Sequence, residues 1–281
     1  MCEMTQSPST SPGSYDEHSA EEDGILHSPR NFLFKLVFPV LILLVIWEVV
    51  AYVARGFSLI DVGQAFLELM IEGDTDGVTL MEHAGRSIYR VTLGFLLALV
   101  TASPLGIAIG RYRAVNDVLS PVVEALRPIP PIAWIPLSIL MFRTNLVAAQ
   151  VFIIWIGAFF PILLNTTTGV NRTNPVHIDV ARSFGADEQV ILHKIVLPSA
   201  APEMFAGFRI GFGIGWMCLV AAEMIGGGLG LGYLVIITQQ LGRTGQTISA
   251  MLMIGLIGFL ISYLFLYVEK RALRWRIEVS I

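Results

Sequence analysis

Among the ionisable side chains that interrupt otherwise apolar stretches of this sequence, three are the best placed for chemistry on an ion. Glu48 and Glu223 lie within or at the end of such stretches, and Arg127 stands among prolines in "LRPIPPIAWIPLSILMF". A charge in an apolar environment is costly unless it is paired, hydrated or used to bind an ion. Arg127 could attract an anion or extend toward water, and structural pairing is an equal alternative for each acid.

No catalytic or metal-binding pattern accompanies these charges. Neither His-Glu-x-x-His nor Gly-x-Ser-x-Gly occurs, and the five histidines are scattered. The segment "GGGLGLG", residues 226–232, lacks the Lys-Ser or Lys-Thr of a phosphate loop, so we expect a flexible hinge there. Cys2 and Cys218 are expected to be free thiols. The sequence therefore predicts a protein that is not an enzyme and that binds no metal or cofactor itself.

The elements that hold these residues must be membrane helices. The 281 residues are 54% hydrophobic and only 14% charged, and their mean hydropathy is +0.70, which predicts a multi-pass membrane protein surrounded by lipid. The net charge of −4 includes an acidic tail, so it indicates no nucleic-acid partner. Residues 1–28 form this tail and are expected to be disordered. Residues 29–281 are expected to form one transmembrane domain.

Six apolar stretches approach the ~20 residues that a helix needs to cross the hydrocarbon layer. They are residues 32–54, 91–110, 118–142, 146–168, 206–225 and 248–268. The third is interrupted by Pro128, Pro130, Pro131 and Pro136, so it must be kinked or partly unwound, and such breaks favour pore lining over a simple bend. Six spans put both termini on one side, and the distribution of Lys and Arg predicts that this side is cytoplasmic.

Small residues mark one face of the fifth span. Gly207, Gly211 and Gly215 recur at a spacing of four, which places them on one side of a helix. Such a face lets another helix backbone approach closely. The partner could belong to the same chain or to a second copy.

The loop at residues 170–202 is long and hydrophilic, and it lies on the predicted cytoplasmic side. Asn174 and Pro175 are a cap and a first residue typical of a helix start. Val176, Val180 and Phe184 then form an apolar stripe at a spacing of four. Because the loop lies in water, this stripe needs another protein surface to cover it.

A glycine separates this helix from a second one. Gly185 can end the first helix in the left-handed conformation. Asp187 and Glu188 suit the start of the second helix, and basic residues suit its end, before Pro198 is expected to stop it. The sequence therefore predicts two short amphipathic helices at a glycine elbow.

"DVARSFGA", followed by "IVLP" at residues 195–198, closely resembles the cytoplasmic coupling loop of ABC importer permeases. The usual form of that loop is Glu-Ala-Ala, three residues, Gly, then Ile-x-Leu-Pro. Asp179 and Val180 depart from this form, and the matching residues are Ala181, Gly185, Ile195, Leu197 and Pro198. "HAGRSIYRVTLGF", "LRPIPPIAWIPLSILMF" and "AAEMIGGGLGLGYL" are similar to segments of nitrate, sulfonate, taurine and bicarbonate permeases.

The resemblance implies an all-α, six-helix permease of the type I ABC importer class in a prokaryotic plasma or inner membrane. It implies a homodimer, two ABC ATPase subunits that use ATP and Mg, and an extracytoplasmic substrate-binding protein. The substrate would be a small anion such as nitrate, a sulfonate or bicarbonate. A transmembrane subunit of an energy-coupling vitamin importer is one alternative, although it would lack "RPIPP" and "AAEMIGGGLG". A secondary transporter or channel is the other, although it would not need the loop.

The resemblance and the residue types together give three groups of candidate residues. The ATPase-coupling group is Asp179, Ala181, Arg182, Phe184, Gly185, Ala186, Leu197 and Pro198. The candidate pathway group is Arg127, Pro130, Pro131, Trp134 and Glu223, in which Trp134 is more typical of packing. The helix-packing group is Gly207, Gly211 and Gly215.

Overall fold

A computed structural model describes residues 38, 41–42, 45–49 and 58–273. The predicted tail and most of the predicted first span lie outside the described residues. The chain divides into two units, residues 1–61 and 62–281. In the first unit, the Glu48 carboxylate accepts a hydrogen bond from the Leu59 N–H at 3.1 Å. This contact makes Glu48 a cap on the helix that begins at Leu59.

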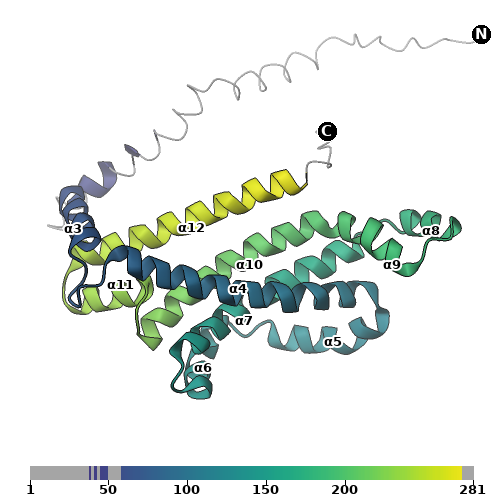
Figure 1. Cartoon of the computed structure of the whole chain (residues 1–281), viewed down its shortest axis with the longest axis horizontal. Coiled ribbons are helices and arrows are strands. Elements are labelled where there is room, and N and C mark those ends of the chain that lie inside the picture. The colour runs from purple at the N-terminus through teal and green to yellow at the C-terminus, as the bar shows by residue number, and fades with distance from the viewer. Residues whose placement is uncertain (1–37, 39–40, 43–44, 50–57, 274–281) are drawn as a thin grey trace, which may run out of the picture. The chain divides into compact units, whose positions relative to one another are not determined.

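All regular secondary structure in the described residues is helical, which confirms the predicted class (Figure 1). The elements are α3 (Leu59–Ile71), α4 (Leu80–Arg111), α5 (Arg113–Leu126), the 3-10 helix η1 (Pro131–Trp134), α6 (Ile135–Phe142), α7 (Leu146–Asn171), α8 (Pro175–Ser183), α9 (Glu188–Ile191), the π-helix η2 (Leu192–Val196), α10 (Leu197–Gly226), α11 (Leu231–Gln240) and α12 (Thr244–Ala272).

Four of these helices are long and apolar enough to cross a membrane: α4, α7, α12 and the continuous helix Glu188–Gly226. α5 together with η1 and α6 is apolar enough to count as one more span, and this pair bends by 84° at the prolines, which gives up to five spans in the described residues. The predicted break in the third span is therefore confirmed. These five elements correspond to five of the six predicted spans.

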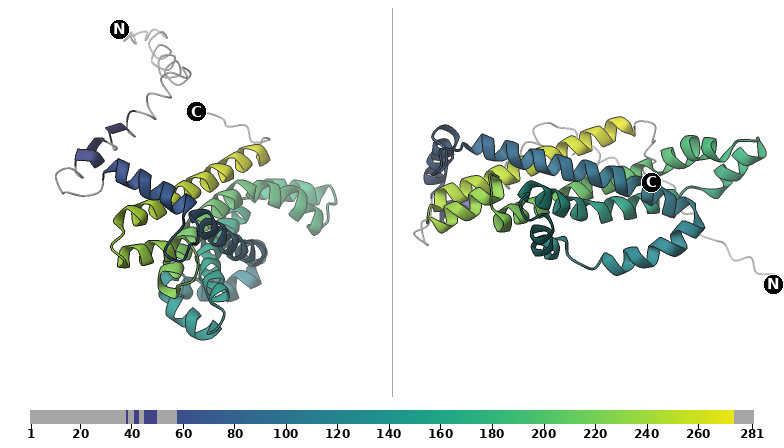
Figure 2. Two further views of the ribbon diagram at one scale, coloured as in Figure 1. Left: turned by 60° about the vertical axis from the view of Figure 1, so that its left-hand side comes forward. Right: turned by 60° about the horizontal axis from the view of Figure 1, so that its bottom comes forward.

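The central packing unit consists of α4, α7 and α10, which run alongside one another with α7 in contact with both neighbours (Figures 1 and 2). Ile154, Ala158 and Ile162 of α7 are buried in this core. Phe95 of α4, Phe212 of α10 and Phe265 of α12 meet with ring centroids 5.3–5.6 Å apart. The aromatic cluster thus joins α12 to the central unit, and aromatic pairs at such distances add to the energy of burial.

Local sequence signals fix where these helices begin. Thr79 and Glu82 form a capping box at the start of α4, in which the side chain of each accepts a hydrogen bond from the backbone N–H of the other. Asn145 caps α7 by accepting from the Ala148 N–H at 3.0 Å. The caps therefore fix the residues at which α4 and α7 begin.

The glycine face of α10 lies against α7 of the same chain. A Cβ added at Gly207 would lie 2.6 Å from the Asn165 Cβ, and one added at Gly211 would lie 2.9 Å from the Ile162 Cγ1. At Gly215 the corresponding distance to the Ile154 Cγ2 is 3.3 Å. The helix that packs against this glycine face is therefore α7 of the same chain, which is one of the two alternatives that the sequence left open.

Replacing Gly211 with Leu is expected to lower the midpoint of thermal unfolding by roughly 3–10 °C, because overpacking costs about 1–3 kcal/mol. Gly213 provides a matched control, since a Cβ there would meet nothing within 4 Å. Thermal unfolding of the Gly211→Leu and Gly213→Leu variants in detergent measures the difference. Equal effects of the two substitutions would contradict close packing at Gly211.

Candidate functional site

The long loop begins with α8, as its sequence predicts. The Asn174 side chain accepts a hydrogen bond from the Val176 N–H at 3.0 Å, and Pro175 is the first helical residue. Gly185 ends the helix with a φ of +77°, and the Ala186 N–H then bonds to the Ala181 carbonyl at 3.0 Å. This left-handed ending turns the chain back toward the membrane helices.

The outer face of α8 is an uncovered apolar surface. Val176 and Val180 are 60% and 49% exposed, and Phe184 at the end of the helix is 88% exposed. Asp179 extends from the same helix and is also exposed. None of the described residues buries this surface, so it is available to a partner protein.

The inner face of α8 uses small side chains to pack closely on the membrane helices. Ala181 and Ala186 pack against a buried cluster that includes Ile191, Val196 and Ala200. Alanines let α8 approach α9 and the start of α10. These two members of the coupling group therefore position the loop, whereas Phe184 and Asp179 form its outer surface.

A bridge of charged side chains holds the elbow. Glu188 at the start of α9 accepts hydrogen bonds from the Arg182 Nε and Nη2 atoms at 3.0 and 2.8 Å. The same carboxylate also pairs with Arg111 at the end of α4. Arg182 is thus directed toward its own loop, and the bridge links α8 to the membrane helix α4.

The expected stop at Pro198 is wrong. Helix α9 continues through the π-helix η2 into α10, so a single helix runs over Glu188–Gly226. Pro198 is the second residue of α10, where a proline removes no hydrogen bond that an α-helix beginning there requires. The wider π-turn before it absorbs the local change in hydrogen bonding. The second helix of the loop is therefore continuous with α10, which contains the predicted span at residues 206–225.

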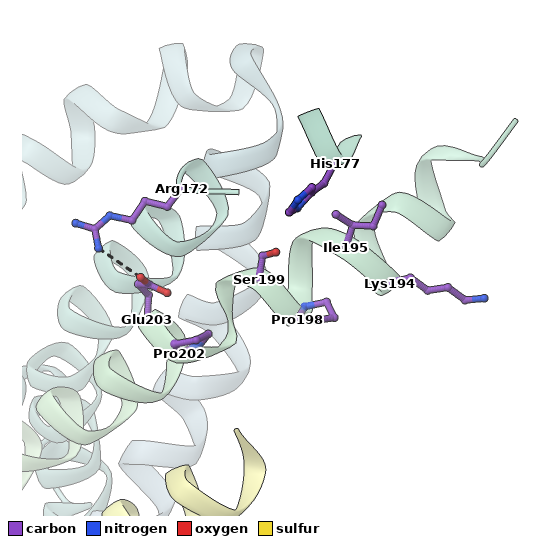
Figure 3. A pocket seen from close by; sticks show the side chains of 8 residues that line it. All are labelled: Arg172, His177, Lys194, Ile195, Pro198, Ser199, Pro202 and Glu203. Atoms are coloured by element: carbon purple, nitrogen blue, oxygen red, sulfur yellow. Dashed lines mark hydrogen bonds and ion pairs between the residues drawn. The ribbon is translucent and has the colours of Figure 1, made fainter. Parts of the chain in front are cut away.

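A cavity of about 530 Å³ lies between α8 and the start of this helix. Figure 3 shows His177 of α8 facing the turn that carries Ile195, Pro198 and Ser199. At one side of the cavity Arg172 pairs with Glu203 at 3.3 Å, and at the other side Lys194 extends outward (Figure 3). The open space beside the π-turn leaves room for α8 to shift against α10.

The pathway candidates do not form one cluster. Arg127 and Pro131 line a cavity of about 400 Å³ at the break in the third span, and Pro130 precedes the 3-10 turn there. Trp134 lines a separate apolar cavity with Phe152 and Trp155, which agrees with a packing role.

Glu223 does not line the cavity at the break and is completely buried. Its carboxylate accepts hydrogen bonds from Arg90 at 2.8 Å, from Ser87 at 2.9 Å and from the Gly232 N–H at 2.9 Å. Structural pairing, the alternative considered for this acid, is the arrangement observed.

The same cluster fastens the glycine-rich segment. The Gly230 N–H donates to the His83 Nδ1 at 3.0 Å, and the Leu231 N–H donates to the Ser87 hydroxyl at 2.9 Å. His83 also contacts Asp74 through Nε2 at 3.1 Å. Gln150 and Arg90 also donate to the Gly227 and Leu229 carbonyls, so the segment is held along its length, in contrast to the flexible hinge that its composition suggests.

Sequence reasoning missed three members of this cluster, although a signal was present. His83, Ser87 and Arg90 are spaced by four and three residues, which places them on one face of α4. The predicted second span begins at residue 91, so these three residues were placed outside it and the pattern was not recognised. A polar stripe in an apolar helix predicts a buried partner, and Glu223 is that partner.

Comparison with known proteins identifies the family of this chain. Residues 94–274 match the family described as binding-protein-dependent transport system inner membrane component. A putative ABC transporter permease of Methanocaldococcus jannaschii is 40% identical, with 88% of this chain and 93% of that protein covered. The taurine transport system permease protein of Escherichia coli is 33% identical, with 72% and 73% covered.

Other relatives are nitrate, bicarbonate and aliphatic sulfonate permeases that are 31–35% identical. Among solved structures, an inward-facing methionine ABC transporter has a TM-score of 0.57 at 22% identity, with 69% of this chain and 94% of that chain covered. This likeness shows that the fold is that of a type I ABC importer permease. The chain therefore belongs to the family of binding-protein-dependent transport system inner membrane components, the permeases of ABC importers.

Proposed function

We propose that this chain forms the translocation path of an ATP-driven importer for a small anion and couples to ABC ATPase subunits through α8 and the Gly185 turn. In this assembly two copies of the chain pair with two ATPases and receive substrate from an extracytoplasmic binding protein. ATP and Mg act in the ATPases, so the permease is a non-catalytic subunit. Both termini and the α8 loop lie in the cytoplasm.

The observation that carries the ATPase contact is the exposed apolar stripe of α8. A large aromatic side chain such as Phe184, 88% exposed at the end of a hydrophilic loop, gains free energy only when another surface covers it. Asp179 beside the stripe adds a charge that can orient the contact. A protein groove on the cytoplasmic side is the surface that fits this geometry.

The contacts of α8 with the membrane helices would transmit a movement of the loop to those helices. The bridge from Arg182 through Glu188 to Arg111 ties α8 to α4, and the continuous helix from Glu188 ties it to α10. Because α4 and α10 both pack on α7, a displacement of the loop acts on the central three helices together. Closure of the ATPases would in this way tilt the spans that line the path.

We infer the class of substrate from the permeases that are related to this chain. Permeases for taurine, nitrate, bicarbonate and sulfonates share the family and similar segments, and all these solutes carry an anionic group. Arg127 lines the cavity at the break in the third span and supplies a cation there. An anionic solute is therefore the class that we propose.

Replacing Phe184 with Asp tests the ATPase contact. Burying a phenylalanine contributes about 1.5–3 kcal/mol, so recovery of the ATPase with the purified permease should fall roughly tenfold or more. Gln189→Asp is the matched control, because it places the same charge on an exposed position of the loop away from the stripe. Unchanged ATPase recovery in the Phe184 variant would exclude the stripe as the contact surface.

A further inference from the structure

The cavity of about 530 Å³ between α8 and the start of α10 gathers polar side chains from several elements. Arg172 directly follows α7, His177 lies in α8 and Lys194 lies in the π-helix η2. Ser199 adds a hydroxyl from the first turn of α10. Apart from Glu203, the rest of the lining is isoleucine and proline. This space, which we call the loop cavity, therefore fits an anion that is joined to an apolar group.

Most donors in the loop cavity have no acceptor in the described part of the chain. The side chains of His177, Lys194 and Ser199 form no hydrogen bond or ion pair with the described residues. Arg172 donates to the Glu203 carboxylate only through Nη1, at 3.3 Å, and its side chain is 70% exposed. A guanidinium carries five N–H donors, so most of them remain available to a ligand. In Figure 3, His177 and Ser199 lie between Arg172 and Lys194, whose flexible stem lets its ammonium turn toward a bound anion.

The position of the loop cavity along the helices matches the polar layer of a membrane. Arg172 lies four residues beyond the predicted span 146–168, and Glu203 lies three residues before the predicted span 206–225. At a helical rise of about 1.5 Å per residue, both residues are roughly 5 Å outside the hydrocarbon layer. The head groups of a bilayer occupy about 5–8 Å on each side of that layer. The loop cavity is therefore at the level of the lipid head groups.

We propose that the loop cavity binds the phosphate group of an anionic membrane lipid and that the bound head group holds α8 against α10. Arg172 and Lys194 neutralise the phosphate charge, and His177 and Ser199 donate hydrogen bonds to its oxygens. Basic pockets between membrane helices bind anionic head groups in this way. The role in holding α8 rests on the proposed function, which places this end of the helices in the cytoplasm and α8 against the ATPase.

Native mass spectrometry of the purified full chain, titrated in detergent with dioctanoyl phosphatidylglycerol, measures the affinity. Arg172→Gln and Lys194→Gln should each weaken binding about fivefold, which is the contribution of one Lys or Arg beside an anionic membrane surface. Arg113→Gln and Lys270→Gln are the matched controls, because they remove exposed cations outside the loop cavity. The controls should leave the affinity unchanged. Thermal unfolding at the wild-type midpoint shows that each variant is folded.

Glu203 provides a test with the opposite sign. Its carboxylate competes with a phosphate for Arg172 and repels it, so Glu203→Gln should strengthen lipid binding. Glu269→Gln is the matched control, because Glu269 pairs with Arg209 at 3.4 Å outside the loop cavity and its side chain has the same 25% exposure. A general attraction of lipid to the charge of the protein would make the two substitutions equivalent, and that result would contradict a site at the loop cavity.

Three probes separate the possible sources of the phosphate group. Dioctanoyl phosphatidylglycerol should bind more tightly than dioctanoyl phosphatidylcholine, whose choline compensates the phosphate charge. It should also bind more tightly than inorganic phosphate, which cannot use the apolar lining. If inorganic phosphate binds as tightly as phosphatidylglycerol and depends equally on Arg172, the ligand is a soluble phosphate and the lipid assignment is wrong.

The effect on coupling is measured with the assembled importer in vesicles of phosphatidylcholine, with and without phosphatidylglycerol. Uptake per ATP hydrolysed should rise with phosphatidylglycerol in the wild type, but not in the Arg172→Gln, Lys194→Gln double variant. Equal lipid affinity in the wild type and the folded double variant would overturn the site. So would a Lys194→Gln permease that keeps its lipid but recovers no ATPase, because the loop cavity would then belong to the protein contact.

Failure of the proposed function gives a different result. A wild-type permease that recovers no ATPase and takes up no solute in either kind of vesicle contradicts the proposed function. The lipid titration uses the permease alone, so its outcome is independent of that failure. The head-group site and the coupling role are therefore tested separately.

Discussion

Replacing Glu223 with Ala is expected to lower the free energy of unfolding by about 3–5 kcal/mol, because it leaves the buried Arg90 guanidinium without its carboxylate. The Glu223 side chain is fully buried and that of Arg90 is 8% exposed, so water cannot replace the lost partner. The Ser87 hydroxyl and the Gly232 N–H lose their acceptor in the same step. The midpoint of thermal unfolding should fall by on the order of 10 °C.

A double variant separates this effect from a role in transport. Arg90→Met combined with Glu223→Leu removes both charges, and apolar replacements of a buried pair often restore stability. We expect the double variant to unfold at a higher temperature than Glu223→Ala. A Glu223→Ala protein that keeps its thermal midpoint but loses uptake would instead place Glu223 in the pathway.

The spans and the elbow were predictable because each depends on local sequence. Apolar runs of sufficient length define four of the membrane helices, and the four prolines within residues 128–136 define the broken one. Asn174 and Gly185 fix the two ends of α8 through a side-chain cap and a positive φ, which are properties of single residues. Such signals are independent of which helices pack together.

Contacts between segments that are far apart in the sequence were harder to predict. Arg90 and Glu223 are 133 residues apart, and only the packing of α4 beside α10 and the glycine-rich segment brings them together. Asn165 joins the cavity of Arg127 because α7 crosses the break, which no spacing within the sequence reveals. The continuation of α9 into α10 was missed because a proline stops a helix only where its N–H is needed.

The turn at Gly185 leads to the prediction with the largest expected effect on transport. Its φ of +77° lies in the left-handed region, where a β-branched side chain is strongly disfavoured. A Cβ at this position would meet nothing within 4 Å, so the cost of Gly185→Val arises from backbone strain of about 1–3 kcal/mol and not from a clash. The loop should relieve this strain by changing the angle between α8 and α9.

The consequence is a loss of coupling in a protein that remains folded. The spans do not depend on the turn, so Gly185→Val should insert and remain folded, while substrate-stimulated ATP hydrolysis and uptake in liposomes should fall at least tenfold. Gly185→Asn is the matched control, because asparagine tolerates the left-handed conformation and the surrounding space is open. It should couple nearly as well as wild type. If the Val variant couples as well as the Asn variant, the direction of α8 does not depend on this turn, and transmission through the Gly185 elbow is excluded.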